Sequence, residues 1–133
     1  MSEPISFVDF KPGEVMGSVS HTYSQELSDA WGEIFGEAAS ESSRRAEAAG
    51  VATVMMMRAY LEVVTPRPPG NIHARQQITT QGTPCLGELI SNQISCTSKE
   101  VRRGRRYVEL KAVGSGNGQR PIYTGHITLI WAT

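Results

Sequence analysis

The chain has 133 residues, which is the size of one ordinary domain, so we expect a single domain that spans residues 1–133. Its 13 Lys and Arg residues balance 13 Asp and Glu residues, which excludes a global electrostatic field that recruits nucleic acid or an anionic membrane. The two cysteines, Cys85 and Cys96, show no CxxC spacing and no neighbouring histidine cluster, so we expect reduced thiols and no metal site.

The N-terminal region predicts a strand followed by an amphipathic helix. "SFVDFKPGEVMGSVSHTYSQE" has a Pro-Gly turn and then loosely alternating apolar residues, which favours a short strand or two. The first residues lack the basic and apolar regions of a signal peptide, so we expect the cytoplasm as the compartment. Ser28 and Asp29 are N-cap candidates for a helix through "AWGEIFGEAASES", where apolar residues recur at helical spacing.

Three glutamates, Glu33, Glu37 and Glu41, follow one another at intervals of four residues. On one continuous helix they would form a single stripe. The plain interpretation of this stripe is a solvated helix face. The alternative is that one of the three carboxylates belongs to an active site.

Residues 48–64, "AAGVATVMMMRAYLEVV", form the only long apolar stretch. Arg58 and Glu62 interrupt it before it reaches membrane-spanning length, so it predicts a buried helix and no membrane association. We expect this helix to begin after Gly50, to be apolar nearly all round and to be enclosed on most sides. The following "TPRPPG" ends it, because its prolines cannot continue a helix.

The remainder of the chain, from Asn71 onward, predicts strands. Four segments with alternating apolar residues are separated by "RRGRR" and "GSGNGQ" and indicate an antiparallel meander. Helices early and strands late favour an α+β fold in which a sheet is wrapped against one buried helix.

Several motifs together resemble the hot-dog fold of MaoC-like dehydratases and (R)-specific enoyl-CoA hydratases. They are the apolar helix after a glycine ("GVATVMMM"), the Pro-rich exit, a "P-x-x-G-E" turn at Pro84, Gly87 and Glu88, two long hairpin strands and a closing "G-x-x-x-L-x-W". The resemblance covers roughly residues 7 to 132. It implies an antiparallel sheet around a central helix and a role in fatty acid metabolism. It also implies acyl-thioester substrates, with CoA or acyl carrier protein as part of the substrate and no separate cofactor.

The catalytic motif of this family is similar to G-D-x-N-P-x-H and lies just before the central helix. Its Asp and His hold a water molecule and move a proton, because hydration needs one group to deprotonate water and another to protonate the α-carbon. Here Gly36 matches the glycine, Glu37 takes the Asp position and Ser42 replaces the His, while Ala39 and Ser40 replace Asn and Pro. The resemblance therefore makes Glu37 a candidate base and Gly36 and Ser42 candidate substrate contacts. The alternative for Glu37 is a structural or solvated glutamate.

Histidine elsewhere offers a second catalytic group. His73 follows the turn into the sheet, and the nearby Asn71 is a candidate to orient a thioester carbonyl. The alternative for His73 is a strand-end residue that packs at a subunit interface. We expect His21 and His126, on the terminal strands, to be surface residues.

The "RRGRR" hairpin carries four positive charges. Apart from Tyr107 it lacks the aromatic platforms typical of nucleic-acid binding, so we expect no nucleic-acid partner. A solvated turn is the plain interpretation. Binding of CoA phosphates by Arg103 and Arg105 is the alternative, because a guanidinium fork suits phosphate oxygens.

Three functions are consistent with these residues. The first is an enoyl-CoA hydratase or 3-hydroxyacyl dehydratase that uses Glu37, with help from His73. The second is a non-catalytic acyl-CoA-binding or accessory subunit of a hydratase complex. The third is an acyl-CoA thioesterase with Glu37 or Glu62 as base, although an ion pair with Arg58 explains Glu62 more simply.

The expected architecture also predicts an oligomer. A single small sheet leaves an exposed strand edge, and pairing two such edges covers it. We therefore expect a homodimer or a hetero-oligomer with another hot-dog chain.

Overall fold

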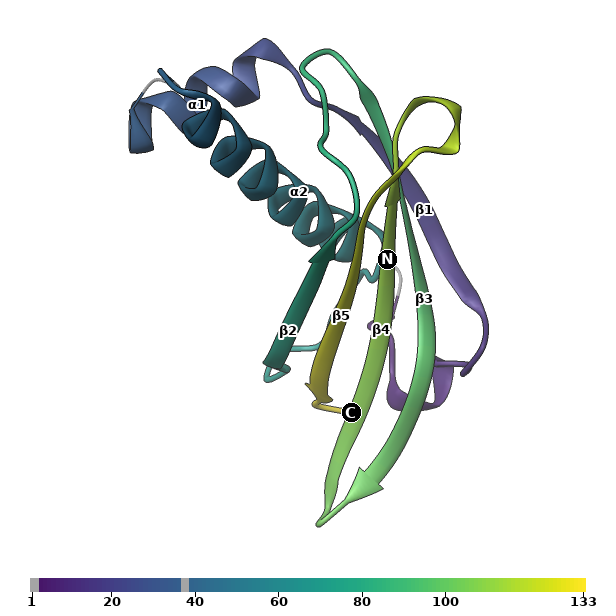
Figure 1. Cartoon of the computed structure of the whole chain (residues 1–133). Helices are drawn as coiled ribbons and strands as arrows, with labels where there is room; N and C mark the ends of the chain where they lie inside the picture. The colour runs from purple at the N-terminus through teal and green to yellow at the C-terminus, as the bar shows by residue number, and fades with distance from the viewer. Residues whose placement is uncertain (1–2, 37–38) are drawn as a thin grey trace.

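The structure is a computed structural model and describes residues 3–36 and 39–133 (Figure 1). Two helices occur early in the chain, and four of the five strands follow them, which confirms the predicted α+β class. In chain order the elements are η1 (Phe7–Asp9), β1 (Val15–Thr22), α1 (Gln25–Phe35), α2 (Glu41–Val63), β2 (Ile72–Thr80), β3 (Leu89–Arg102), β4 (Arg105–Ser115), η2 (Asn117–Gln119) and β5 (Pro121–Trp131).

The strands form one five-stranded antiparallel sheet in the order β1-β3-β4-β5-β2. The predicted meander is confirmed for β3, β4 and β5, which are consecutive neighbours. It is wrong for β2, which pairs with β5 at one edge of the sheet instead of with β3. The loop over residues 81–88 therefore carries the chain from one side of the sheet to the other.

Helix α2 lies across one face of the sheet and supplies much of the core (Figure 1). Its buried face includes Val51, Met55, Met56 and Ala59. Met55 and Met56 are fully buried, and each such side chain contributes about 1.5–3 kcal/mol relative to an exposed one.

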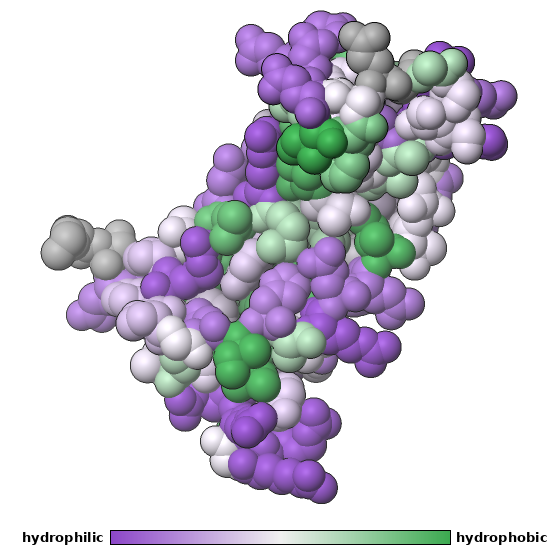
Figure 2. All heavy atoms as spheres, turned by 90° about the vertical axis from the view of Figure 1, so that its left-hand side faces the viewer, coloured by the Kyte–Doolittle hydropathy of each residue, from purple (hydrophilic) through white to green (hydrophobic). Residues whose placement is uncertain are grey.

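The opposite side of α2 faces solvent, so the prediction of a helix enclosed on most sides is wrong. Arg58, Leu61 and Glu62 are exposed there. Figure 2 views the left-hand side of Figure 1 and shows apolar side chains exposed in separate patches among hydrophilic ones. The exposed large apolar residues of the molecule include Ile34, Phe35, Leu61 and Ile72.

The helix boundaries differ from those predicted. Helix α1 is capped by Ser24, whose side chain accepts a hydrogen bond from the backbone N–H of Leu27 (3.2 Å), so the predicted caps Ser28 and Asp29 lie inside the helix. It ends at Phe35, because Gly36 adopts a positive φ of 88° that ordinary side chains rarely adopt.

Helix α2 begins at Glu41, capped by Ser40, and not after Gly50. Glu33 and Glu41 consequently belong to two different helices. The predicted single stripe of glutamates is therefore wrong.

None of the helices within the described parts of the chain is long and apolar enough to cross a membrane.

Candidate active site at the N-terminal end of the central helix

The residues of the predicted catalytic motif lie between α1 and α2. Gly36 ends α1, and Ser42 is exposed in the first turn of α2. Glu37, the predicted base, lies outside the described residues. Its role and those of Gly36 and Ser42 remain predictions.

His73 and Asn71 lie at the other end of α2. This helix has 23 residues and is therefore about 34 Å long. The ring of His73 packs edge-on against Tyr60, with 6.1 Å between ring centroids, and Asn71 accepts a hydrogen bond from the backbone N–H of Ala132 (2.7 Å). Within one chain, the structure therefore does not bring His73 and Asn71 together with Gly36 and Ser42.

Arg103 and Arg105 are exposed at the tip of the β3–β4 hairpin, at the end of the sheet away from α1 (Figure 1). The other two arginines of the hairpin, Arg102 and Arg106, contact residues of the chain itself. Arg102 stacks on Tyr107, with 4.3 Å from its guanidinium carbon to the ring centroid, and Arg106 donates to the carbonyl oxygens of Trp131 and Ala132.

Glu62 and the remaining histidines also differ in part from prediction. Glu62 pairs with His21 (Nε2 to Oε2, 2.9 Å) instead of with Arg58, and the side chain of His21 is only 17% exposed, so it is not a surface residue. His126 is exposed on β5, as predicted. Cys96 is buried in β3, whereas Cys85 is an exposed residue of the 81–88 loop.

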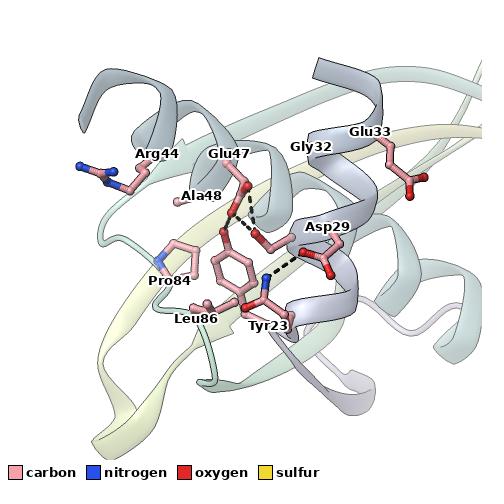
Figure 3. Close-up of a pocket in the computed structure, with 11 residues that line it drawn as sticks. Tyr23, Asp29, Gly32, Glu33, Arg44, Glu47, Ala48, Pro84 and Leu86 are labelled. Carbon is pink, nitrogen blue, oxygen red and sulfur yellow. Dashed lines mark hydrogen bonds between the residues drawn. The ribbon is translucent and has the colours of Figure 1, made fainter. Parts of the chain in front are cut away.

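A cavity of about 710 Å³ lies where α1, the first half of α2 and the 81–88 loop meet (Figure 3). Gly32 and Glu33 line it from α1, and Arg44 and Glu47 line it from α2, so residues on both sides of the predicted motif contribute to it. The other lining residues are Tyr23, Gln25, Ser28, Asp29, Ala48, Pro84 and Leu86.

The carboxylate of Glu47 is the buried polar group of this cavity. Glu47 is only 8% exposed. It accepts hydrogen bonds from the hydroxyl of Tyr23 and from Ser28 Oγ, which lies 3.0 Å from Oε2 and 3.2 Å from Oε1 (Figure 3). Arg44 also lines the cavity but points away from Glu47. Hydroxyl donors therefore compensate the burial of this carboxylate, which is costly without partners.

The environment of Tyr23 keeps its hydroxyl protonated. Burial raises the pKa of Tyr23 above its ordinary value of 10.0, and the hydrogen bond to Glu47 and the negative charge of that carboxylate raise it further. The phenol consequently remains a hydrogen-bond donor at neutral pH.

The 81–88 loop is held against the cavity by Glu88. Its buried carboxylate accepts hydrogen bonds from the backbone N–H groups of Cys85 and Asn117 (2.9 Å each) and from Arg120 Nη2 (2.5 Å). Burial alone would raise the pKa of Glu88, but these hydrogen bonds outweigh it and hold the pKa below its ordinary value of 4.5.

Backbone hydrogen bonds join the same loop to Tyr23. The N–H of Tyr23 donates to the carbonyl oxygen of Glu88 (2.9 Å), and the N–H of Gly87 donates to that of Tyr23 (2.7 Å). The loop that carries Pro84 and Leu86 and the phenol that reaches Glu47 are therefore positioned together.

Sequence reasoning missed Glu47, Tyr23 and Ser28. A signal for Glu47 was present, because Glu47, Val51 and Met55 recur at intervals of four residues and so share the buried face of α2. No local spacing signals the contact with Tyr23, which lies 24 residues away in the chain.

No group of three or more His, Cys, Asp or Glu side chains that could hold a metal ion occurs in residues 3–36 and 39–133. The carboxylate of Glu47 has hydroxyl neighbours instead of further metal ligands.

Comparison with known proteins relates the chain to others through its structure. No protein-family model and no curated protein matches the sequence. Among solved structures, the chain is similar to the MaoC-like dehydratase from Rhodospirillum rubrum (TM-score 0.73, 12% identity, 97% of this chain and 98% of that chain covered). It is similar to the (R)-hydratase PhaJ1 from Pseudomonas aeruginosa (TM-score 0.71, 12% identity, 96% and 86% covered).

A third similar structure is a complex of two different chains, ChsH1–ChsH2 from Mycobacterium tuberculosis (TM-score 0.67, 11% identity, 92% and 98% covered). These likenesses extend over nearly the whole chain and confirm the fold that the sequence motifs predicted. The chain has the hot-dog fold in the form found in MaoC-like dehydratases and (R)-hydratases.

Proposed function

We propose that the chain binds acyl thioesters in the cavity at the N-terminal end of α2 and hydrates 2-enoyl thioesters, or dehydrates 3-hydroxyacyl thioesters in reverse. The observation that carries this proposal is a buried carboxylate, Glu47, on the wall of an acyl-sized cavity. Glu33 and Arg44, which line the cavity, flank in the sequence the residues 36–42 where the resemblance to MaoC-like dehydratases places the catalytic motif.

The dimensions and lining of the cavity support this substrate class. Its volume of about 710 Å³ lies within the range of about 300–1,000 Å³ that is typical of small-molecule sites. Ala48, Pro84 and Leu86 provide an apolar surface for an acyl chain, while Glu47 and Tyr23 provide polar groups for the thioester end. The thioester is carried by CoA or acyl carrier protein, both of which are available in the proposed compartment, the cytoplasm.

We also propose that the chain acts as a homodimer or pairs with another hot-dog chain. Strands β1 and β2 are the edges of the sheet, and apolar residues such as Leu61 and Ile72 are exposed. Arg103 and Arg105 lie far from the cavity of their own chain. We propose that in the pair they contact the phosphates of CoA held by the partner chain.

Loss of enone absorbance tests the proposal. Purified protein is mixed with short-chain and medium-chain trans-2-enoyl-CoA, and binding of a saturated acyl-CoA is measured in parallel. We expect the absorbance to fall as water adds across the double bond. A fall in absorbance that is matched by the release of free thiol would instead support the thioesterase alternative, because hydrolysis of the thioester also destroys its conjugation with the double bond.

A specific observation favours a second candidate, an accessory subunit. His21, His73 and His126 all lie outside the described lining of the cavity, so no imidazole is placed to share proton transfer with a carboxylate there. An accessory subunit would bind the saturated acyl-CoA without hydrating the enoyl-CoA, and would gain activity only with a partner chain.

A further inference from the structure

We infer that Glu47 and Tyr23 form the proton-transfer pair of this cavity, in which Glu47 accepts a proton from water and Tyr23 supplies one to the substrate. This inference rests on the proposed hydratase function. It assigns the chemistry to a carboxylate and a phenol instead of to the carboxylate and imidazole that the predicted motif would require.

One oxygen of the Glu47 carboxylate, Oε1, can accept a further hydrogen bond. Among the described residues, Tyr23 and Ser28 both donate to Oε2, whereas Oε1 receives only the longer bond from Ser28 (3.2 Å). A carboxylate oxygen can accept two hydrogen bonds, so Oε1 retains a site for a water molecule. None of the basic side chains described in residues 3–36 and 39–133 forms an ion pair with Glu47, so no cation fixes it as a structural partner.

The phenol supplies the second group that hydration requires. Tyr23 directly follows β1 and lines the same cavity, and its hydroxyl donates directly to Glu47. Burial keeps this hydroxyl protonated, because it raises the pKa of Tyr23. Tyrosine is among the side chains that act as general acids when they are held within hydrogen-bond reach of the reacting atom.

The reaction balances with these two groups. Glu47 Oε1 removes a proton from water while the water oxygen bonds to the β-carbon of the enoyl thioester. The electron pair of the double bond moves to the α-carbon, which takes the proton of the Tyr23 hydroxyl. The protonated carboxyl group of Glu47 then rotates about its Cγ–Cδ bond, which brings the proton from Oε1 to the side of Tyr23, and returns it to the Tyr23 oxygen, so that water has been added and both side chains are restored.

A structural role for Glu47 makes a different prediction from a catalytic role. To hold Tyr23 and Ser28 in place, residue 47 needs only a hydrogen-bond acceptor, which the amide oxygen of glutamine also supplies. To take a proton from water it must be a carboxylate. Glu47→Gln therefore keeps the structural function and removes the catalytic one.

The experiment compares turnover of trans-2-enoyl-CoA with the Kd for a saturated acyl-CoA in Glu47→Gln, Tyr23→Phe and Glu37→Gln. Glu26→Gln is the matched control, because Glu26 is exposed on α1 and lies outside the cavity lining. We expect Glu47→Gln and Tyr23→Phe each to lower kcat by about 10²–10⁴-fold, with the Kd and the circular dichroism spectrum unchanged. The control is expected to match the wild type.

Three results would overturn the inference, and they can be told apart. Wild-type turnover in Glu47→Gln and Tyr23→Phe, with a loss confined to Glu37→Gln, would leave the proposed function standing and move the base to Glu37. A rise in Kd without a fall in kcat would make Glu47 a binding residue. Absence of both binding and turnover in the wild-type protein would remove the proposed function together with the inference.

Discussion

Replacing Gly50 with alanine tests how α1 is held against α2 and thereby how the cavity is built. Gly50 lies inside α2, and the ring of Trp31 from α1 packs directly on it, next to the ring of Phe35 (4.3 Å between ring centroids). A Cβ atom at position 50 would overlap Cη2 and Cζ3 of Trp31. Alanine therefore cannot be accommodated unless Trp31 moves.

Two opposing effects determine the size of the change. Glycine to alanine inside a helix ordinarily stabilises a protein by about 0.5–1 kcal/mol. Overpacking a close contact costs about 1–3 kcal/mol, and here the alanine meets a rigid ring instead of a flexible chain end. We therefore expect Gly50→Ala to lower the free energy of unfolding by a net of about 1–2 kcal/mol.

Urea denaturation followed by circular dichroism measures this change, and Trp31→Ala supplies the control. In the Trp31→Ala background the overlap is gone, so Gly50→Ala should stabilise the protein by its ordinary helix effect. Stabilisation by Gly50→Ala in the wild-type background as well would refute the packing of Trp31 on Gly50.

Other predictions concern the cavity loop, the core and the hairpin. Glu88→Gln should weaken the acid dependence of stability. Because the pKa of Glu88 is lowered on folding, its charged form stabilises the wild type at neutral pH, and this contribution is lost as the pH falls below about 4.5, which thermal melts across pH will show. Tyr123→Phe should cost about 1–3 kcal/mol in urea denaturation, because it leaves the buried Asn92 Oδ1 without its 2.7 Å donor. Arg103→Ala combined with Arg105→Ala should raise KM for acyl-CoA and weaken its salt dependence, and an unchanged KM would refute phosphate contacts there.

The fold was largely predictable because its signals are local. Alternation of apolar residues in β3, β4 and β5 reflects one face of each strand against the core, and the prolines after α2 end that helix. The position of β2 was not predictable, because its pairing with β5 joins segments about fifty residues apart.

Glycines account for two of the three errors in the helix boundaries, and the third is the start of α1, where Ser24 is the N-cap. Gly50 predicts a helix start, but it lies within α2. The residue is a glycine there because the ring of Trp31 occupies the space that a side chain would fill. Gly36 was included in a helix, but its positive φ ends α1. A glycine that breaks a helix and one that admits a neighbouring ring look the same in a sequence, since only tertiary contacts distinguish them.

The site was harder to predict than the fold. The motif predicted at Gly36, Glu37 and Ser42 remains untested, but the cavity is lined by Glu33 and Arg44, which flank it in the sequence. The motif did not identify Glu47 or Tyr23, because the contact between them depends on how β1 approaches α2. Long-range packing, and not local spacing, brings these two side chains together.

Amide chemical shifts during titration with a saturated medium-chain acyl-CoA test the central claim most directly, because they locate the ligand without requiring turnover. The proposed site predicts saturable shifts that are largest around Ser28, Ala48 and Leu86, which line the cavity from three different segments. Saturable shifts that leave these three residues unchanged, or no shifts at high ligand concentration with the protein folded, would contradict it.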